Sequence, residues 1–371
     1  MKSNYKRLGD YIVEVDIRNQ QDKNLELWGV SIEKKFIKSV ANIIGTDLSK
    51  YKVINKDCFV CSLMQVSRDE KIPIARWNDE TEVIVSPAYK VFRVKDHSFI
   101  MPEFMDLWFK RAEFDREASF YGVGGVRGSL EWEDFCEMRI PVPPIEEQEK
   151  IVAAYQKIET RIALKKKINE NLEAQAYEIY KKYLSLSDLK CGKISDLADT
   201  IVCGKTPSTN IEQNFNGDIP FITIPDMHDK VFAIKTERCI SRNAATCLIP
   251  KNSVCVSCIA SAGLVVLTDR ISQTNQQINT IVCKKSVSPY YVFFQMKELS
   301  EYIRQIGSCG STTFNLSKSN FSNIEILIPS EEIQKKISIF EKPIFEALKH
   351  NQKECLALEK LQSVSLTRLA T

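Results

Sequence analysis

Two cysteine pairs have the spacing of a zinc site. The chain reads Cys-x-x-Cys at Cys58 and Cys61 and again at Cys255 and Cys258, and four thiolates in two such pairs can bind zinc as a tetrahedron. Each pair, however, lies in an apolar run typical of a β-strand, where neighbouring side chains face opposite ways. With only three histidines, a histidine-based metal or acid–base centre is also poorly supplied. We therefore expect buried thiols and no metal site.

Two glycine-containing segments resemble nucleotide-binding loops. Residues 204–206 read Gly-Lys-Thr, like the end of a P-loop, but Asp199 stands where the motif needs its first glycine and Pro207 follows at once. Residues 122–128 read Gly-Val-Gly-Gly-Val-Arg-Gly, with the third glycine of a dinucleotide loop out of place and no βαβ pattern around it. The sequence therefore favours turns over nucleotide sites in both segments.

Motifs for DNA cleavage and methylation are incomplete. Residues 33–35 read Glu-Lys-Lys and fit the end of a nuclease Glu-x-Lys motif, but no Pro-Asp precedes them to supply the companion metal ligand. The methyltransferase signature of Asn or Asp, Pro-Pro and an aromatic residue is absent, because residues 142–145 read Val-Pro-Pro-Ile. We therefore expect no catalytic residue and no cofactor in this chain.

Composition limits the class of protein. The chain has 371 residues, 44% hydrophobic and 27% charged, as in ordinary globular proteins, and it is long enough for two domains. It contains no apolar stretch that could span a membrane, and no apolar segment follows the basic residues of its N-terminal region. We expect a cytoplasmic protein whose twelve cysteines are reduced. A net charge of +3 does not by itself indicate nucleic-acid binding, so phosphate contacts would need local clusters or a partner.

A long internal repeat organises the chain. A shift of 186 residues aligns Gly124 with Gly310 and holds to the C-terminus without a gap. It gives about a dozen identities over roughly sixty positions, where unrelated sequence gives roughly three or four. Farther upstream the repeat weakens, although residues 56–59 match 251–254 and the aromatic stretch 104–109 falls near 290–295. The repeat predicts a duplicated domain-plus-helix with pseudo-twofold symmetry.

A long helix is expected after each copy. Residues 146–184 contain neither glycine nor proline, and a 4-3 spacing of apolar residues there and in the second copy is typical of a coiled coil. We predict helices over residues 145–184 and 330–371 that pack antiparallel, with Lys165 and Asn351 selecting the register. Two solvated surface helices are the alternative. The expected packing residues are Ile151, Ile158, Ile162, Leu172, Ile179, Ile337, Ile344, Leu348 and Leu358.

Two details qualify the helix prediction. Pro343 should kink or restart the second helix, because an interior proline removes a hydrogen bond and clashes with the preceding turn. About 40 residues at 1.5 Å each make a rod of roughly 60 Å, longer than a domain core needs. Such a rod is suited to act as a spacer.

Several segments resemble the specificity subunits of type I restriction-modification enzymes. Residues 140–151 read Ile-Pro-Val-Pro-Pro-Ile-Glu-Glu-Gln-Glu-Lys-Ile, and residues 328–337 repeat the pattern as Ile-Pro-Ser-Glu-Glu-Ile-Gln-Lys-Lys-Ile. The second copy also has landmarks of a target recognition domain, namely Gly-Lys-Thr-Pro-Ser at 204–208, Gly-Asp-Ile-Pro-Phe-Ile at 217–222, Asn275-Gln276, and Gly-Ser-Thr-Thr at 310–313. The first copy lacks these landmarks, so we expect a different subtype of recognition domain there.

The resemblance implies an α/β (α+β) fold of two globular recognition domains, residues 1–144 and 185–329, in pseudo-twofold tandem and separated by the two helices. Each domain would read one half of a bipartite target in double-stranded DNA. The helices would set the spacing and dock two methyltransferase (modification) subunits, to which restriction (translocase and nuclease) subunits can be added. S-adenosylmethionine, ATP and Mg are expected only on those partners, and no membrane is involved.

Candidate DNA contacts are basic, amide and hydroxyl side chains in polar segments. Lysines and arginines would contact phosphates, and amides and hydroxyls would contact base edges. Simple turns explain residues 122–128 and the serines and threonines equally well. The candidates are Lys34, Lys35, Arg76, Arg127, Lys205, Thr206, Ser208, Thr209, Asn275, Gln276, Thr312, Thr313 and Lys318.

Two other functions remain open at this point. One is a fused methyltransferase or endonuclease with an unrecognised catalytic site, which methyl transfer by the purified chain alone would reveal. The other is a duplicated coiled-coil scaffold that binds only proteins. Sequence-specific DNA binding by the assembled complex would exclude the scaffold.

Overall fold

The computed structural model describes residues 5–20, 24–40, 45–64, 66–123, 128–259, 261–308 and 316–370. The chain forms two compact units: the first contains Met1–Arg161 and Leu358–Thr371, and the second contains Ile162–Ala357. The boundaries lie within the two long helices, so each unit combines a globular domain with adjoining parts of both helices. No helix in these residues is both long and apolar enough to cross a membrane.

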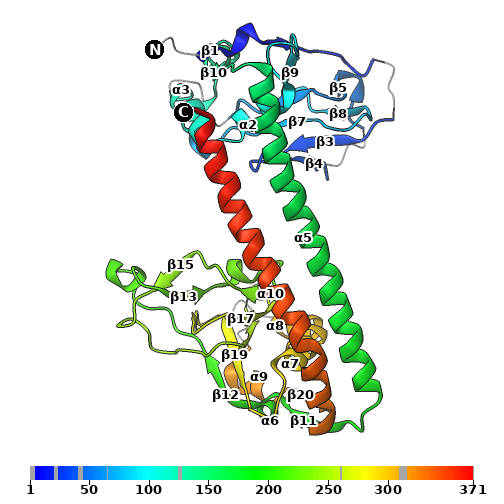
Figure 1. The fold of residues 1–371 in the computed structure, drawn as a ribbon, viewed down its shortest axis with the longest axis vertical. Helices are drawn as coiled ribbons and strands as arrows, with labels where there is room; N and C mark the ends of the chain where they lie inside the picture. The colour runs from blue at the N-terminus through cyan, green and yellow to red at the C-terminus, as the bar shows by residue number, and fades with distance from the viewer. Residues whose placement is uncertain are drawn as a thin grey trace. The chain divides into compact units, whose positions relative to one another are not determined.

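The globular part of the first unit contains two four-stranded sheets (Figure 1). Neighbouring strands are antiparallel except for the parallel pair β3 and β8. One sheet has the order β2 (Ile12–Glu14), β9 (Lys90–Val94), β6 (Phe59–Cys61), β7 (Ile74–Arg76). The other has the order β4 (Phe36–Lys38), β3 (Leu27–Val30), β8 (Val83–Val85), β5 (Lys52–Ile54).

Helices cover the first of these sheets with aromatic side chains. Helix α2 (Pro102–Phe109) begins at a proline, whose fixed φ suits the first helical turn. It buries Phe109 against Phe59 and Phe92, which stack with their ring centroids 5.2 Å apart. The remaining helical segments are η1 (Leu8–Asp10), η2 (Leu48–Lys50), α1 (Val66–Asp69), α3 (Ala112–Tyr121), α4 (Trp132–Glu137) and η6 (Arg368–Ala370).

The second unit has a five-stranded and a three-stranded sheet. The larger has the order β12 (Ala198–Cys203), β19 (Ile278–Cys283), β16 (Val254–Ser257), β17 (Val265–Thr268), β14 (Phe232–Ala233). The smaller has the order β15 (Arg238–Ile240), β13 (Ile219–Ile222), β18 (Gln273–Thr274). The helical segments are α6 (Ile194–Leu197), η4 (Glu212–Phe215), η5 (Ile224–Met227), α7 (Pro289–Glu298), α8 (Ser300–Ser308) and α9 (Lys318–Ser322).

The two units share most of their strand pairings, so the repeat extends upstream into both sheets of each domain. Strand β2 pairs with β9 and β9 with β6, as β12 pairs with β19 and β19 with β16. The parallel pair β3 and β8 corresponds to the parallel pair β13 and β18. A short antiparallel pair precedes each long helix: β1 (Tyr5–Arg7) with β10 (Arg139–Pro141), and β11 (Lys190–Lys193) with β20 (Glu325–Ile328).

Local structure supports the weak upstream part of the repeat. Asp57 and Asn252, which the alignment matches, both have left-handed backbones, with φ of 65° and 63°. Asp and Asn tolerate this conformation better than most residues. Each precedes the equivalent strand, β6 or β16, and the aromatic stretches both fall in helices that start with proline, at Pro102 and Pro289.

The Pro and Gln residues repeated before each long helix have a structural role. Gln148 is fully buried; its amide donates to the carbonyls of Phe99 and Pro143, at 2.9 and 2.8 Å, and accepts from the backbone of Met101 at 2.9 Å. In the second copy the buried Gln334 donates to the carbonyl of Pro329 at 3.1 Å. The repeated glutamine therefore ties the first helical turn to the proline before it.

The long helices are α5 (Ile145–Ser185) and α10 (Glu331–Thr367) (Figure 1). In the second unit their contacts run antiparallel, from the ion pair of Lys165 with Glu354 to the stacked rings of Tyr183 and Phe340. The predicted α/β fold with two globular domains and two packed long helices is confirmed. The restart predicted at Pro343 is wrong, because α10 continues through it as one helix.

The predicted packing residues of the two long helices are buried to different degrees. Ala176 and Tyr180 are fully buried near the end of α5, and Ile179 beside them is half-buried. Buried members of the predicted seam are Ile162, Ile337 and Leu348, and half-buried members are Ile151, Ile158, Leu172, Ile344 and Leu358.

Lys165 and Asn351 meet in the seam, as the sequence predicted. The Lys165 ammonium donates to Asn351 Oδ1 at 2.8 Å and lies 2.9 Å from a Glu354 carboxylate oxygen. Asn351 Nδ2 donates to Asn169 Oδ1 at 3.0 Å. Lys165 and Asn351 occupy equivalent positions of the repeat, 186 residues apart. The two long helices therefore meet at equivalent positions of the repeat.

Candidate nucleic-acid interface

The loop that follows β12 packs tightly on the turn that follows β18. At Gly204, a Cβ atom would lie 2.2 Å from the Asn275 carbonyl oxygen and 2.3 Å from that of Thr274, so only glycine fits without a shift. The backbone of Lys205 donates to the Thr274 carbonyl at 3.0 Å. The Gln273 side chain in turn donates to the Lys205 carbonyl at 2.7 Å. The backbone on both sides of this contact is therefore fixed.

Polar side chains project from this fixed backbone. Thr206 Oγ1 donates to Gln276 Oε1 at 2.6 Å, which orients the Gln276 amide. Lys205, Ser208, Thr209 and Gln276 are exposed, and Thr206 is half-buried. Five predicted residues from two distant segments thus form one surface, which we call the Gly204 surface (Lys205, Thr206, Ser208, Thr209 and Gln276). It offers an ammonium group, hydroxyls and an amide to solvent.

Asn275 has a different role from the one predicted. Its side chain is 8% exposed. Its amide donates to Gln277 Oε1 at 2.9 Å, while its oxygen accepts from the Gln277 backbone at 3.1 Å. Its own backbone donates to the Ile222 carbonyl at 3.2 Å. The prediction of Asn275 as a base contact is corrected, because both ends of the side chain build the turn that presents Gln276.

Lys318 lies beside this surface. It is the first residue of α9 and is exposed, and α9 contacts β12. Burial raises the pKa of the Cys203 thiol at the end of β12, and the nearby Lys318 ammonium opposes that rise. The chain is anchored just before α9, where Asn279 Nδ2 donates to the Leu316 carbonyl at 3.1 Å. The predicted residues Thr312 and Thr313 lie outside the described residues.

Two predicted contacts of the first domain turn out to be interior groups. The Lys34 ammonium lies 2.7 Å from Asp115 and donates to the Phe109 carbonyl, and burial lowers its pKa. Lys34 also has a left-handed backbone, with φ of 60°. Its assignment to DNA is therefore corrected, because a buried and paired ammonium cannot reach a phosphate.

The predicted DNA contact by Arg76 is corrected for the same reason. Its guanidinium contacts Asp57 at 2.5 Å and Glu103 at 2.8 Å, and its side chain is 10% exposed. Removing it from these two carboxylates would leave charges unpaired in a largely buried site. Lys35 is exposed, as a DNA contact requires, and Arg127 lies outside the described residues.

The cysteine pairs are buried thiols, as expected. Cys58, Cys61, Cys255 and Cys258 lie in or beside β6 and β16 and are at most 1% exposed. Burial raises the pKa of Cys255 to about 12 and that of Cys258 to about 11. Within the described ranges, no group of three or more His, Cys, Asp or Glu side chains is placed to hold a metal ion.

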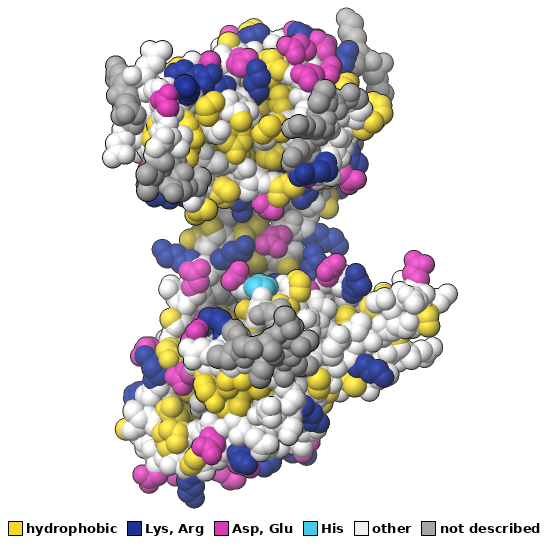
Figure 2. Space-filling view, turned by 180° about the vertical axis from the view of Figure 1, so that it is seen from behind, with side chains coloured by type: hydrophobic (Ala, Val, Ile, Leu, Met, Phe, Trp, Pro, Cys, Tyr) yellow, Lys and Arg dark blue, Asp and Glu magenta, His cyan; other side chains and the backbone are white. Residues whose placement is uncertain are grey.

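Charge is mixed over the surface. On the face drawn in Figure 2, lysine and arginine side chains are interspersed with aspartate and glutamate in both units. This agrees with a net charge of only +3. Any polyanion contact must therefore come from local groups such as those of the Gly204 surface.

Comparison with known proteins assigns the family. Residues 37–174 and 187–358, which cover most of both copies of the repeat, match the type I restriction modification DNA specificity domain. The chain belongs to the type I DNA specificity family. This confirms the resemblance drawn from the proline- and glutamine-containing segments before each long helix.

Relatives of this type I specificity protein include specificity subunits from two organisms. It is 40% identical over 187 residues to the type I restriction enzyme HindI specificity subunit of Haemophilus influenzae, a match that covers 47% of this chain and 39% of that protein. It is 32% identical over 177 residues to the MjaIX specificity subunit of Methanocaldococcus jannaschii, covering 46% and 40%. The matches thus span about two fifths of the length of these relatives.

A solved structure has the same fold. The type I restriction-modification S subunit from M. genitalium superposes on this type I specificity protein with a TM-score of 0.62 and 12% identity. The match covers 98% of this chain and 95% of the other. At this identity the likeness supports the arrangement of two domains and two long helices and does not assign the role of any residue.

Proposed function

We propose that this chain is the DNA-recognition subunit of a type I restriction-modification complex, and that each domain reads one half of a bipartite target. The observation that carries the proposal is the match of the DNA specificity family to both copies of the repeat. The shared topology of the two units supports it, since two equivalent domains suit two half-sites. No reaction is assigned to the chain itself.

The Gly204 surface and Lys318 read the half-site of the second domain. Lys205 and Lys318 contact phosphates, which position the domain but carry no sequence information. Gln276 reads a base edge, because a glutamine amide can pair with N6 and N7 of adenine in the major groove. Thr206 supports this role, since its hydrogen bond to Gln276 Oε1 orients the amide and leaves the second lone pair of Oε1 for a base. Ser208 and Thr209 add hydroxyls to the same surface.

The long helices determine spacing and partners. In this proposal α5 and α10 hold the two domains at a fixed separation, which sets the number of base pairs between the half-sites. The polar contact of Lys165 with Asn351 fixes the register of the two helices. Two methyltransferase subunits dock on the helices and carry S-adenosylmethionine. Restriction subunits, where present, carry ATP and Mg.

Reconstitution with the neighbouring methyltransferase subunit tests this function. The chain, the methyltransferase, or both are incubated with plasmid DNA and labelled S-adenosylmethionine. We expect methyl transfer only with both proteins, at adenines within a bipartite site. Methyl transfer by this chain alone would show a fused enzyme instead. If the methyltransferase alone transfers methyl groups and this chain does not change the result, the chain is instead a scaffold that binds only proteins.

A further inference from the structure

The first domain has a surface built from the same elements as the Gly204 surface. In the second domain that surface comes from the segment after β12 and the turn that joins β18 to β19. Strand β2 corresponds to β12, and β8 and β9 correspond to β18 and β19. The equivalent segments of the first domain are therefore residues 15–20 and 86–89.

These segments border an open depression lined mainly by basic and polar residues. It has a volume of about 540 Å³ and is lined by Arg18, Gln20, Ser49, Lys50 and Pro87. Arg18 and Gln20 come from the segment after β2, and Pro87 comes from the turn between β8 and β9. Ser49 and Lys50 come from η2, which leads into β5. We call these residues the Arg18 surface.

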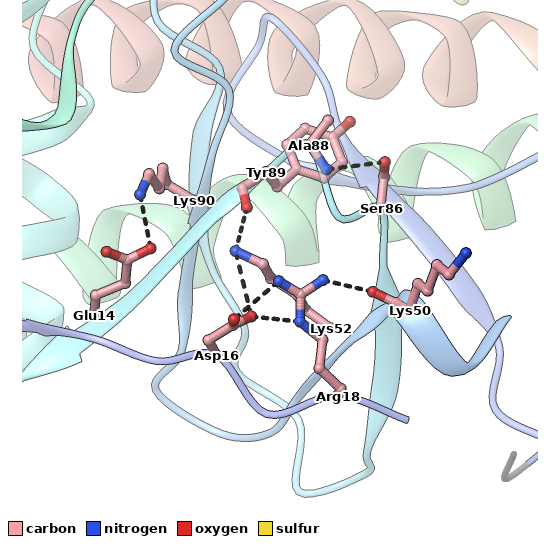
Figure 3. A network of polar contacts seen from close by, with 9 residues as sticks. All are labelled: Glu14, Asp16, Arg18, Lys50, Lys52, Ser86, Ala88, Tyr89 and Lys90. Carbon is pink, nitrogen blue, oxygen red and sulfur yellow. Dashed lines mark hydrogen bonds and ion pairs between the residues drawn. The ribbon is translucent and has the colours of Figure 1, made fainter. Parts of the chain in front are cut away.

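The guanidinium of Arg18 is held in one orientation (Figure 3). Its Nε and Nη2 contact the two carboxylate oxygens of Asp16 at 2.7 and 2.9 Å, and Nη1 donates to the Lys50 carbonyl at 2.6 Å. Asp16 is fixed in turn, because Lys52 lies 3.7 Å away and donates to the Tyr89 carbonyl at 2.9 Å. Lys52 is itself buried.

Two N–H groups of Arg18 have no partner among the described residues and can serve a ligand. A guanidinium has five N–H groups, and its contacts with the described residues use three of them. The arginine side chain is 32% exposed, so it is accessible at the rim of the depression. A supported arginine with two N–H groups left can donate to O6 and N7 of guanine.

Lys50 supplies a different kind of group. Its side chain is 76% exposed, and its ammonium points away from Arg18 (Figure 3). Its ion pair with Asp47 is 3.4 Å long and exposed, which costs little to exchange for a phosphate. The Asp47 carboxylate also accepts from the backbone of Ser49 and so caps η2.

We propose that the Arg18 surface is the DNA-contacting face of the first domain, with Arg18 reading a base edge and Lys50 contacting a phosphate. The inference rests on the proposed function and names the residues through which the first domain would carry it out. The Arg18 surface replaces Lys34 and Arg76 as the candidate DNA contact, because those two side chains form ion pairs inside the domain.

The test uses the full chain in complex with its methyltransferase subunit and two variants, Arg18→Gln and Lys50→Gln. Methylation motifs are sequenced in cells, and duplex affinity is measured at several salt concentrations. For Arg18→Gln we expect one position of a half-site to become degenerate and affinity to fall about 5- to 150-fold. For Lys50→Gln we expect weaker binding with an unchanged motif and a salt slope lower by about one.

Lys38→Gln is the matched control. Lys38 is an exposed lysine on β4, at the opposite edge of the same sheet from β5, so its loss should change neither motif nor affinity. If Arg18→Gln and Lys50→Gln both behave like Lys38→Gln, the inference is overturned. If Arg18→Gln fails to fold, Lys50→Gln decides the outcome, since its side chain is exposed. Absence of any bipartite motif with the unaltered chain would instead overturn the proposed function.

Discussion

Glu341 is a carboxylic acid buried in the second unit without a hydrogen-bond partner among the described residues. It is 0% exposed, and both carboxylate oxygens lack a hydrogen bond to any described residue. Burial raises its pKa to about 9. Burial is also the main cause of the raised pKa of the Tyr290 hydroxyl on α7, to which the Glu341 carboxylate, when charged, contributes. At neutral pH the folded protein therefore keeps Glu341 protonated.

Replacing Glu341 with glutamine should stabilise the protein at alkaline pH. Because the folded pKa lies above the unfolded value, the folded state binds one more proton, and stability falls as pH rises from about 4.5 towards 9. Glu341→Gln removes this proton uptake, so at pH 8 we expect a gain on the order of a few kcal/mol. Urea unfolding at pH 5 and pH 8 measures it; an equal difference between variant and parent at both pH values would contradict the assignment.

Lys205 on the Gly204 surface and the adjacent Lys318 should both act through phosphates. Lys205→Gln and Lys318→Gln are each expected to weaken binding of specific and non-specific duplexes alike, and to lower the salt slope of binding by about one. Ser185→Ala, an exposed change at the end of α5, provides the control. A change of methylation motif in either lysine variant would show that the residue reads bases instead.

Single residues were predictable where local sequence determines their environment. The Gly204 loop was recognised because glycine, proline and hydroxyl residues mark a turn, and the structure places its side chains beside Gln276. Lys34 and Arg76 were misassigned because their carboxylate partners lie far away in sequence, at Asp115 and Glu103. Arg18 was overlooked because its loop has no such glycine or proline signature.

At the scale of elements, the first turn of each long helix is tied to the proline before it by a buried glutamine. Gln148 makes three hydrogen bonds, whereas the equivalent Gln334 makes one, to Pro329, and its Oε1 has no partner among the described residues. The two copies of the motif therefore contribute unequally to stability.

Alanine substitutions at these two positions should lower the stability of the protein to different extents. We expect Gln148→Ala to lower the free energy of unfolding by roughly 2–4 kcal/mol, because three backbone groups lose their hydrogen-bond partner, and Gln334→Ala by about 1 kcal/mol. Urea unfolding of both variants measures the difference. Equal losses, or a larger loss for Gln334→Ala, would show that these bonds do not control the junction.

The long helices themselves were predictable from sequence to within a few residues, because a glycine-free apolar seam of this length has few other folds available. Pro343 did not end α10, although proline propensity alone predicts a break. Phe345 and Leu348, which follow it, are buried, and such tertiary packing can outweigh local propensity in a long helix. The short strands of each domain were not predictable individually, because strands of two to six residues carry little periodic signal.

At the scale of the whole molecule, the duplication gives the chain two similar domains and two long helices that contact each other. Lys165 and Asn351 are equivalent in the repeat and contact each other. The divergent parts of the two copies still share most of their strand pairings, which sequence comparison could not reveal because different side chains fill equivalent cores. The proposal that the helices act as a spacer follows from this arrangement.

Lengthening both helices by one heptad tests the spacer directly. Seven residues inserted next to Lys165 and at the equivalent position next to Asn351 keep the seam in phase and add about 10 Å. We expect the gap in the methylated motif to grow by about three base pairs, with both half-sites unchanged. An unchanged gap, or altered half-sites, would contradict the spacer role.

The most direct test of the central claim is long-read methylation sequencing of plasmid DNA from cells that express this chain with its neighbouring methyltransferase subunit. The account predicts a methylated bipartite motif that disappears when this chain is omitted and that reveals both half-sites. Methylation that is the same without this chain, or no motif from an otherwise active pair, would contradict its role in DNA recognition.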